Sequence, residues 1–311
     1  MTMNRSCSRI STLLACGSLA FTFGLFGAQS QDREDERDMA PSGRGIGTRH
    51  SYGPQSGAFG PARPCKGCGN GIFYHGGPLI LNGTKVYYIW YGNWSGNTAT
   101  TILEDLANSI GGTPYFNINT TYYDGSNNHV ANTVAYYSGT DAYDSYSHGT
   151  SLSDSDVQAI VANQNPTDTN SVYFVLTSAD VNETSGFCKK YCGWHTNAQI
   201  NGLDIKYAFV GNPDRCPKSC EAQTTSPNGN AGADGMASII AHELEEATTD
   251  PDLNAWYDQR GEENADKCAW TFGGTSSAAN GSQYNMVLGG RQYLIQQNWV
   301  NAKGGYCALS Y

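Results

Sequence analysis

The chain of 311 residues carries 28 acidic and 18 basic residues, a formal net charge of -10 at pH 7. Phosphate backbones and anionic lipid repel a protein of this charge that has no basic cluster, so we expect no nucleic-acid partner. After the first thirty residues no apolar stretch is long enough to cross a bilayer, and we therefore expect no membrane span.

The first thirty residues have the pattern of a secretory signal peptide. Arg5 and Arg9 form a positive end, residues 13–27 are apolar but too short to span a bilayer, and residues 28–30 (Ala-Gln-Ser) give a small-x-small cleavage site. An alternative is a lipoprotein anchor at Cys16, although most of the apolar stretch follows that cysteine. We expect the mature protein to be secreted, with 16 basic and 28 acidic residues and a net charge of -12.

Residues 31–63 are rich in charge, glycine, serine and proline and contain almost no large apolar residues. A segment of this composition cannot bury a core, so we predict a disordered polar leader. Residues 64–311 have a normal length for one domain and contain no internal repeat. We predict that they form a single disulfide-stabilised domain.

Dense β-formers and apolar residues at helical spacing alternate along this domain. The predicted elements, in chain order, are a strand at 85–91, helices at 100–110 and 153–163, strands at 171–177 and 205–210, a helix at 236–248 and, at 293–300, a strand in preference to a short helix. Gly and Asp at positions 232–235 are taken as start signals for the last helix. The alternation predicts an α/β fold with an α+β tendency, in which that helix packs on a mixed, partly parallel sheet.

Eight cysteines remain once the signal segment is removed. They are Cys65, Cys68, Cys188, Cys192, Cys216, Cys220, Cys268 and Cys307. An even number in an exported chain favours disulfides, whose pairing the sequence leaves open. The alternative is zinc held by the close pairs 65/68, 188/192 and 216/220, which is less common outside the cell.

The strongest candidate site lies on the predicted helix at 236–248. His242 and Glu246 are four residues apart, so on a helix they point the same way. Glu243 follows His242 directly, as in the zincin signature His-Glu-x-x-His, in which the two histidines bind zinc and the Glu activates water. Glu stands here in the fifth position, so we predict a zincin-like helix with His242 and Glu246 as ligands and Glu243 as general base.

A carboxylate that returns after the helix completes a three-ligand open site in many zinc hydrolases. Glu263 and Asp266 are the two candidates for this third ligand. The alternative is a helix end on the surface, where Glu243, Glu245 and Glu246 are solvated charges.

Two carboxylates and one imidazole are a harder ligand set than two imidazoles and one carboxylate. Zinc is therefore the first expectation, but manganese, iron or calcium also fit. The extra negative charge weakens the pull of the metal on its bound water, which reduces peptidase activity. Asp250, Asp252 and Asp258 offer oxygen ligands for a separate calcium site.

His195 lies in a loop between cysteines, in the run Cys192-Gly-Trp-His195. A hydrogen-bonded structural histidine is favoured here over a catalytic role that lines a cleft or stabilises a transition state. His75 gives a similar but weaker signal. No Gly-x-Ser-x-Gly motif supports a serine nucleophile.

Several runs together resemble the phosphate-induced/EXORDIUM family of secreted proteins. The matching runs are Tyr74-His-Gly-Gly-Pro-Leu79, Tyr88-Ile-Trp-Tyr-Gly-Asn-Trp94, Cys188 with Cys192-Gly-Trp-His195, Tyr207-Ala-Phe-Val-Gly-Asn212, Cys216-Pro-Lys-Ser-Cys220, His242-Glu-Leu-Glu-Glu246 with Asp250-Pro, Asn254-Ala-Trp-Tyr257, Ala265-Asp-Lys-Cys268 and Tyr284-Asn-Met286. They cover about residues 70–307 in order and leave the leader unmatched.

The resemblance implies an extracellular protein of the cell wall or apoplast that is linked in plants to growth responses. It brings no established reaction. Because the Asp of the Ala-Asp-x-Cys run corresponds to Asp266, the resemblance favours Asp266 over Glu263 as the third ligand.

Two hypotheses follow from the residues. In the first, the protein is a metal-dependent hydrolase that acts on a peptide or another extracellular or cell-wall component. In the second, it is a non-catalytic extracellular protein in which the same residues hold a structural ion or a network of salt bridges.

Overall fold

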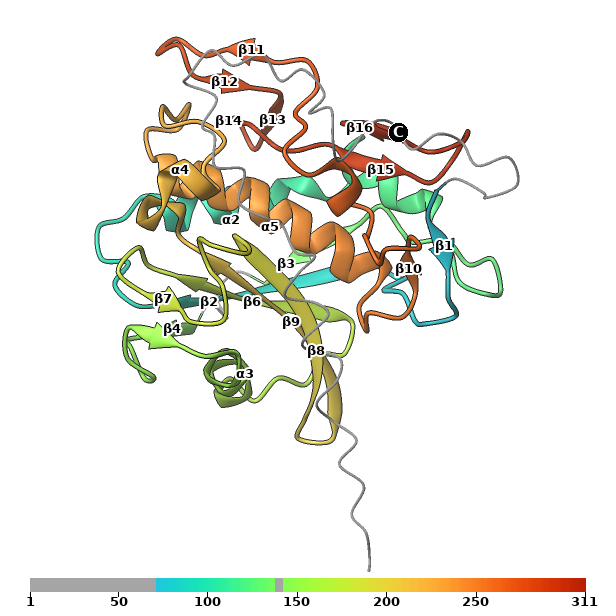
Figure 1. Ribbon diagram of the computed structural model, residues 1–311, viewed down its shortest axis with the longest axis horizontal. Coiled ribbons are helices and arrows are strands. Elements are labelled where there is room, and N and C mark those ends of the chain that lie inside the picture. Colours follow the sequence, from blue (N-terminus) through green and yellow to red (C-terminus); the bar gives the residue numbers. More distant parts are fainter. Residues whose placement is uncertain (1–70, 138–141) are drawn as a thin grey trace, which may run out of the picture.

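The computed structural model describes residues 71–137 and 142–311. The predicted signal peptide, the lipobox cysteine, the polar leader, Cys65 and Cys68 all lie outside these residues. Within them the chain forms a mixed α/β structure with several sheets (Figure 1). The coarse fold class predicted from the sequence is therefore confirmed.

The central sheet has six strands among the described residues. Its order is β3-β2-β6-β9-β8, with β4 also paired to β2. The bounds are β2 Thr84–Tyr91, β3 Val134–Tyr136, β4 Ala142–Asp144, β6 Ser171–Thr177, β8 Gly193–Ile200 and β9 Leu203–Gly211. All pairs are parallel except β8 with β9, which is antiparallel. The predicted mixed sheet and its three predicted strands are present.

Helices cover both faces of this sheet (Figure 1). Helices α2 (Ala99–Ile110) and α5 (Ala231–Thr249) lie on one face, and α3 (Asp154–Asn163) lies on the other. A capping box between Ser153 and Asp156 begins α3. The shorter helical segments are η1 Phe116–Thr121, η2 Pro213–Arg215, α4 Pro217–Cys220 and η3 Asp266–Cys268.

Helix α5 begins earlier than the sequence predicts. Its N-cap is Asn230, whose side chain accepts a hydrogen bond from the amide of Ala233. Gly232 and Gly235, which looked like start signals, lie inside the helix. A Cβ at Gly232 would come within 2.2 Å of the Asn212 side chain, and one at Gly235 within 2.9 Å of Pro213. The glycines therefore permit a close approach of the η2 segment.

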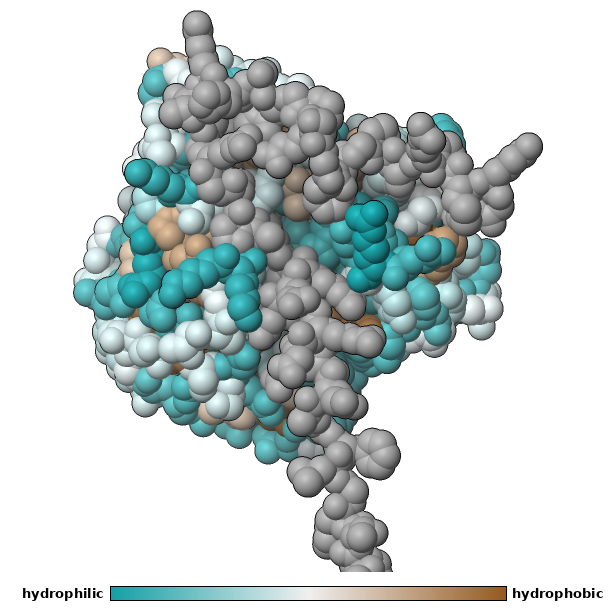
Figure 2. All heavy atoms as spheres, viewed as in Figure 1, coloured by the Kyte–Doolittle hydropathy of each residue, from teal (hydrophilic) through white to brown (hydrophobic). Residues whose placement is uncertain are grey.

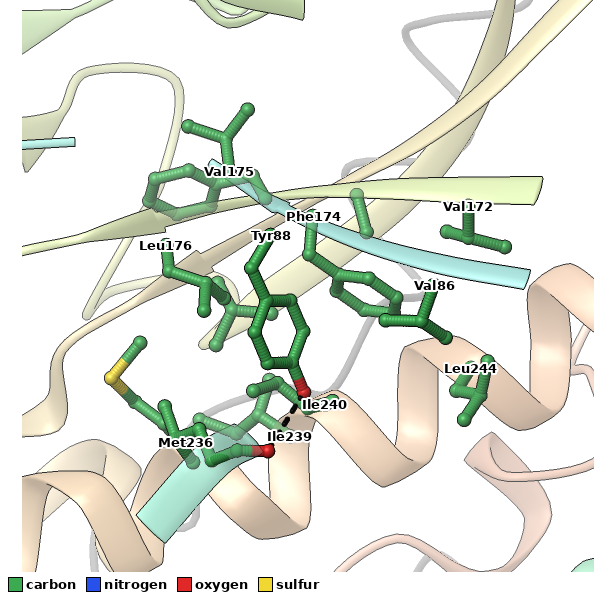
Figure 3. Packing of buried hydrophobic residues seen from close by; sticks show 14 of the residues in the cluster. Val86, Tyr88, Val172, Phe174, Val175, Leu176, Met236, Ile239, Ile240 and Leu244 are labelled. Carbon is green, nitrogen blue, oxygen red and sulfur yellow. Dashed lines mark hydrogen bonds between the residues drawn. The ribbon is translucent and has the colours of Figure 1, made fainter. Parts of the chain in front are cut away.

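One side of α5 packs on the apolar surface of the sheet (Figure 3). The side chains in this contact are Val86 and Tyr88 of β2, Val172 and Phe174 of β6, and Met236, Ile239, Ile240 and Leu244 of α5. Val175 points to the opposite side of β6, as the two-residue period of a strand requires. Full burial of one such side chain contributes about 1.5–3 kcal/mol, so this contact fixes the helix on the sheet.

The C-terminal part of the chain covers the other side of α5 (Figure 1). It consists of two-stranded pairs: β11 Ser276–Ser277 with β12 Gln283–Tyr284, β13 Met286–Leu288 with β14 Arg291–Tyr293, and β15 Asn298–Val300 with β16 Tyr306–Ala308. Two further small pairs join β1 Phe73–Tyr74 to β10 Trp256–Tyr257 and β5 Ser151–Leu152 to β7 Asn182–Glu183.

The single strand predicted at 293–300 is interrupted. β14 ends at Tyr293 and β15 begins at Asn298, so four residues leave the strand conformation. In this interruption the amide of Gln296 donates to the Ser238 hydroxyl of α5, and the amide of Ile295 donates to the Asn285 side chain. The break lets the chain bond to the helix rather than to another strand.

Three disulfides join described cysteines. They are Cys188–Cys216, Cys192–Cys220 and Cys268–Cys307. The close pairs 188/192 and 216/220 are thus linked crosswise, and the alternative that each pair holds zinc is wrong for these four residues. The first two bonds tie the start of β8 to the segment before α5.

No helix in the described part of the chain is long and apolar enough to span a bilayer. Where Figure 2 shows coloured surface, hydrophilic residues dominate and hydrophobic residues form small separate groups. Within residues 71–137 and 142–311, the large apolar side chains that are exposed are Tyr137, Tyr143, Val287, Tyr306 and Tyr311. These are scattered along the chain and do not form one run.

Candidate metal centre

The C-terminal half of α5 is buried on all sides. His242, Glu243, Glu245 and Glu246 each have 0% of their surface exposed. The sheet covers one side of the helix and the C-terminal strand pairs cover the other. The alternative of a surface helix end with solvated glutamates is therefore wrong, and these charges need partners inside the protein.

His242, Glu246 and Asp266 form a first group. The Nε2 atom of His242 lies 3.1 Å from Oε1 of Glu246 and 3.4 Å from Oδ1 of Asp266. Asp266 begins the η3 segment, and its backbone amide donates to Glu246 Oε1 at 2.9 Å. The returning carboxylate thus meets the helix residues that the sequence singled out.

Glu263, the other candidate for a third ligand, faces a different residue. Its Oε2 lies 3.8 Å from Nε2 of His195. Its backbone amide donates to Oδ2 of Asp266 at 3.2 Å. Glu263 therefore orients Asp266 and borders the centre, but it does not belong to the group around His242.

His195, Glu243 and Glu246 form a second group. The Nδ1 atom of His195 lies 3.5 Å from Glu243 Oε2 and 3.6 Å from Glu246 Oε2. His195 is 1% exposed and comes from the start of β8, paired with Ala208 of β9. The sequence favoured a structural role for this histidine, whereas the structure places it against both glutamates of the helix.

Gly193 allows β8 to come this close to α5. A Cβ at this position would lie 2.6 Å from Ile239 Cγ2 and 3.0 Å from Oε1 of Glu243. Real Cβ atoms do not approach other atoms at the shorter distance, so a larger residue would push the strand and the helix apart. The glycine two positions before His195 therefore sets the distance between that histidine and the glutamates.

Gln296 is a partner of the centre that sequence reasoning missed. Its side-chain amide lies 2.5 Å from Nδ1 of His242. A histidine that binds a metal through one ring nitrogen donates the N–H of the other to a carbonyl, a carboxylate or water, and the side-chain oxygen of Gln296 fills this role once its amide group is turned over. No motif marks Gln296, because the contact depends on the break between β14 and β15.

Glu245 lies near the first group along the helix but does not belong to it. Its Oε2 accepts a hydrogen bond from Nδ2 of Asn298 at 2.5 Å. Burial, first of all, and the charge of Glu246 raise the pKa of Glu245 well above its usual value. Glu245 therefore fastens β15 to the helix and takes no part in either group.

The pKa values of the centre reflect burial and crowded negative charge. Burial opposes protonation of His195, but the Glu243 contact and the Glu246 charge raise its pKa to about 9. Burial likewise opposes protonation of His242, yet the charge of Glu246 and the neighbouring Asp266 raise its pKa well above the usual value. Burial and the charge of Glu246 raise the pKa of Asp266 to about 7. The centre therefore attracts positive charge, whether protons or a cation.

Several atoms of the centre are buried without a hydrogen bond. They are Nε2 of His242, Nδ1 of His195, Oε2 of Glu246 and both carboxylate oxygens of Glu243, none of which has a hydrogen-bond partner among the described residues. Among those residues, the ion-pair partners of Glu243, Glu246 and Asp266 are His195 and His242, with no Lys or Arg. Buried polar atoms normally have partners, so these atoms are available to a ligand.

The distances of the first group fit a tetrahedral zinc ion. Donor atoms about 2.1 Å from such an ion lie about 3.4 Å from one another. The two distances from His242 Nε2, 3.1 and 3.4 Å, match this spacing. An imidazole with two carboxylates also suits manganese or iron.

The three aspartates considered for calcium have separate partners. Asp252 lies 3.4 Å from Lys206, and Asp258 lies 3.2 Å from Lys267. Oδ1 of Asp250 accepts two backbone hydrogen bonds, and the Asp250 carbonyl lies near His195. These residues do not form a common site. His75 also lies elsewhere, at the pair β1–β10, where its exposed ring stacks on Tyr257.

Comparison with known proteins identifies relatives over most of the chain. The family model described as the phosphate-induced protein 1 conserved region matches residues 72–309. The chain is 32% identical to Protein EXORDIUM-like 3 of Arabidopsis thaliana over 279 residues, which cover 75% of this chain and 81% of that protein. It is 31% identical to Protein EXORDIUM-like 5 of the same plant, over 73% of this chain and 74% of that protein.

A third relative is Protein PHOSPHATE-INDUCED 1 of Nicotiana tabacum, 26% identical over 59% of this chain and 66% of that protein. No solved structure is significantly similar to the chain. The family match spans both β1 and β16, and thus every residue of the two groups described above. The chain belongs to the phosphate-induced protein 1, or EXORDIUM, family.

Proposed function

We propose that this protein is an extracellular metalloprotein that binds a divalent cation, zinc first, at His242, Glu246 and Asp266. The observation that carries the proposal is the meeting of donor atoms from His242 and Glu246 of α5 and Asp266 of η3 at distances of 3.1 and 3.4 Å. In its catalytic form the protein is a hydrolase of the zincin type that acts on a peptide or another extracellular or cell-wall component.

Each residue has a distinct role in this proposal. His242 and Glu246 lie one helical turn apart and present donors to one point, and the amide of Asp266 holds Glu246 Oε1 in place. When bound, the cation supplies a Lewis acid and makes water a nucleophile near neutral pH. Glu243 would accept a proton from water at this site. Burial raises the pKa of Glu243, which brings it toward the range of an effective general base.

The extracellular location is supported by the cysteines and by the family. Three disulfides among the described residues are typical of an oxidising compartment. The relatives are plant proteins named for EXORDIUM and for induction by phosphate. A cell-wall or apoplast setting is part of the proposal.

A second candidate function is favoured by the depth of the site. His242, Glu243 and Glu246 have no exposed surface, while the side chains of Asp266 and Glu263 are 8% and 10% exposed. A closed site of this kind suits a structural ion that ties α5 to the segment after it. In that case the protein is a non-catalytic extracellular protein, and the ion contributes to folding.

The substitution Glu243→Gln distinguishes the two functions, because it removes the base and preserves the shape of the side chain. We expect the purified variant to retain the metal while it loses hydrolysis of peptides or cell-wall extracts that the wild type cleaves. If the variant keeps the rate of the wild type, the hydrolase proposal is wrong.

If the wild type cleaves no substrate and a chelator lowers its melting temperature, the proposal of a structural ion is correct.

A further inference from the structure

We infer that the centre holds a second divalent cation, bound by His195 and Glu243 and joined to the first through Glu246. Glu246 then bridges the two ions, one on each carboxylate oxygen. The inference rests on the proposed function for its first site and assigns a new site to the second group of residues. When the second site is occupied, Glu243 is a metal ligand and no longer acts as a general base.

The two oxygens of Glu246 face different histidines. Oε1 lies 3.1 Å from Nε2 of His242, and Oε2 lies 3.6 Å from Nδ1 of His195. The ligand atoms of each group lie within 4.8 Å of one another. A carboxylate between two such groups holds metal ions about 3.5–4 Å apart in enzymes with two-metal sites.

The ring of His195 is oriented for a ligand at Nδ1. Its other nitrogen, Nε2, lies 3.4 Å from the backbone carbonyl of Asp250 and can donate its proton there. That arrangement leaves the lone pair of Nδ1 directed at Glu243 and Glu246. Histidines that bind metals typically show this pairing with a carbonyl on the far nitrogen.

The first cation leaves one carboxylate of the centre without a metal ion to balance it. Glu246 and Asp266 together balance one divalent ion, and Glu243 remains as a buried carboxylate beside His195. Both Glu243 oxygens, Nδ1 of His195 and Oε2 of Glu246 make no hydrogen bond to a described residue, and all three side chains are at most 1% exposed. A second cation gives each of these atoms a partner and removes the cost of burying them unpaired.

The elements around this second group hold it rigidly. The disulfide Cys192–Cys220 lies three residues before His195 and fixes the start of β8. Gly193 brings the strand against Ile239 and Glu243 of α5. Ligands on a strand and a helix that cannot separate are preorganised for a small ion.

Occupancy of the second site has a consequence for catalysis. Glu243 cannot accept a proton while its oxygens bind a cation. We therefore expect that the first equivalent of cation activates the protein and the second inhibits it. The second site has the weaker affinity, because Glu246 already shares its charge with the first ion.

The test is a titration of the full secreted chain, stripped of metal, with zinc in equilibrium dialysis and elemental analysis. We expect two equivalents at saturation for the wild type and one for His195→Ala, with the tighter equivalent retained. His75→Ala, which removes an exposed histidine far from the centre, is the matched control and should bind two. Manganese in place of zinc should give an EPR spectrum of two coupled ions in the wild type and of one isolated ion in His195→Ala.

The outcomes separate this inference from the proposed function. If the wild type binds one equivalent, which His242→Ala loses and His195→Ala keeps, the second site does not exist and the first remains. If neither histidine affects binding, both proposals fail. Should His195→Ala fold poorly by circular dichroism, His195→Gln replaces it, and two coupled manganese ions in that folded variant would overturn the inference.

Discussion

The two sides of helix α5 are both buried, but they are buried by different chemistry. The side toward the sheet presents Met236, Ile239, Ile240 and Leu244 to an apolar surface. The side toward the C-terminal segment presents Ser238, His242 and Glu245, which contact Gln296 and Asn298. The apolar side fixes the helix in the fold, and the polar side fixes the residues of the centre.

The two sides differ in how many contacts set their geometry. Apolar contacts depend on area and volume, so several side chains share the stabilisation. The polar contacts are single pairs at defined distances, such as the 2.5 Å contact of Gln296 with His242. Loss of one apolar side chain should therefore cost stability, whereas loss of one polar partner should cost ligand affinity.

The largest effect is expected from Leu244→Ala on the apolar side. The side chain is 1% exposed in the main core, and its removal leaves a cavity. We predict a loss of about 2–5 kcal/mol in the free energy of unfolding, measured by denaturant titration. The control Val287→Ala, at a side chain 59% exposed, should change the free energy by less than about 0.5 kcal/mol. Equal losses at both positions would refute the central role of this contact.

Gly193→Ala should increase the distance between strand β8 and helix α5. The new Cβ would lie 2.6 Å from Ile239 Cγ2 and 2.9 Å from the Phe209 carbonyl, so β8 and α5 must move apart. We predict a loss of about 1–3 kcal/mol of stability, together with weaker metal binding because His195 moves with the strand. Gly274→Ala, where a Cβ meets nothing within 4 Å, is the control. A variant as stable as the wild type would show that the close approach is not needed.

Gln296→Leu tests the polar side alone. The substitution keeps most of the volume but removes the partner of His242 Nδ1. We predict a metal affinity lower by about 10–100-fold with a small change in melting temperature, measured by competition with a chelator. The control Gln199→Leu removes an exposed glutamine on β8. If the affinity is unchanged, the amide does not orient the histidine.

The smallest effect concerns the segment at the N-terminal end of α5. Burial, and then the charge of Asp214, raise the pKa of Glu221 to about 7. A raised carboxyl pKa means that the folded state binds the proton more tightly than the unfolded state, whose pKa is 4.5. This contribution to stability is complete below pH 4.5 and is lost as the pH rises through about 7.

Glu221→Gln should flatten that dependence, because the amide does not titrate. Melting temperatures measured across this pH range would show a shallower slope for the variant than for the wild type. An identical slope in both proteins would mean that Glu221 titrates normally.

The sequence predicted the apolar side of α5 well, because its pattern is local. The strands at 85–91, 171–177 and 205–210 and the spacing of Ile239, Ile240 and Leu244 follow from the periods of strand and helix. The grouping of His242, Glu246 and Asp266 was also within reach, because helical spacing and a returning carboxylate are visible in the chain.

The polar side was harder to predict, because its partners are distant in the sequence. Nothing in the sequence links Glu245 to Asn298, which lies far along the chain and hydrogen-bonds to it. The contact of His195 with Glu243 depends on the antiparallel pairing of β8 and on Gly193. The pairing Cys188–Cys216 is likewise a property of the folded chain and not of the spacing. Propensity and period carry no information on such contacts.

The most direct test of the account is the metal content of the purified secreted protein, measured by elemental analysis for the wild type, His242→Ala and His75→Ala after dialysis in metal-limited buffer. We predict about one equivalent of zinc in the wild type and in His75→Ala and almost none in His242→Ala. The absence of any transition metal from the wild type, or an equal content in His242→Ala, would contradict a metal centre on helix α5.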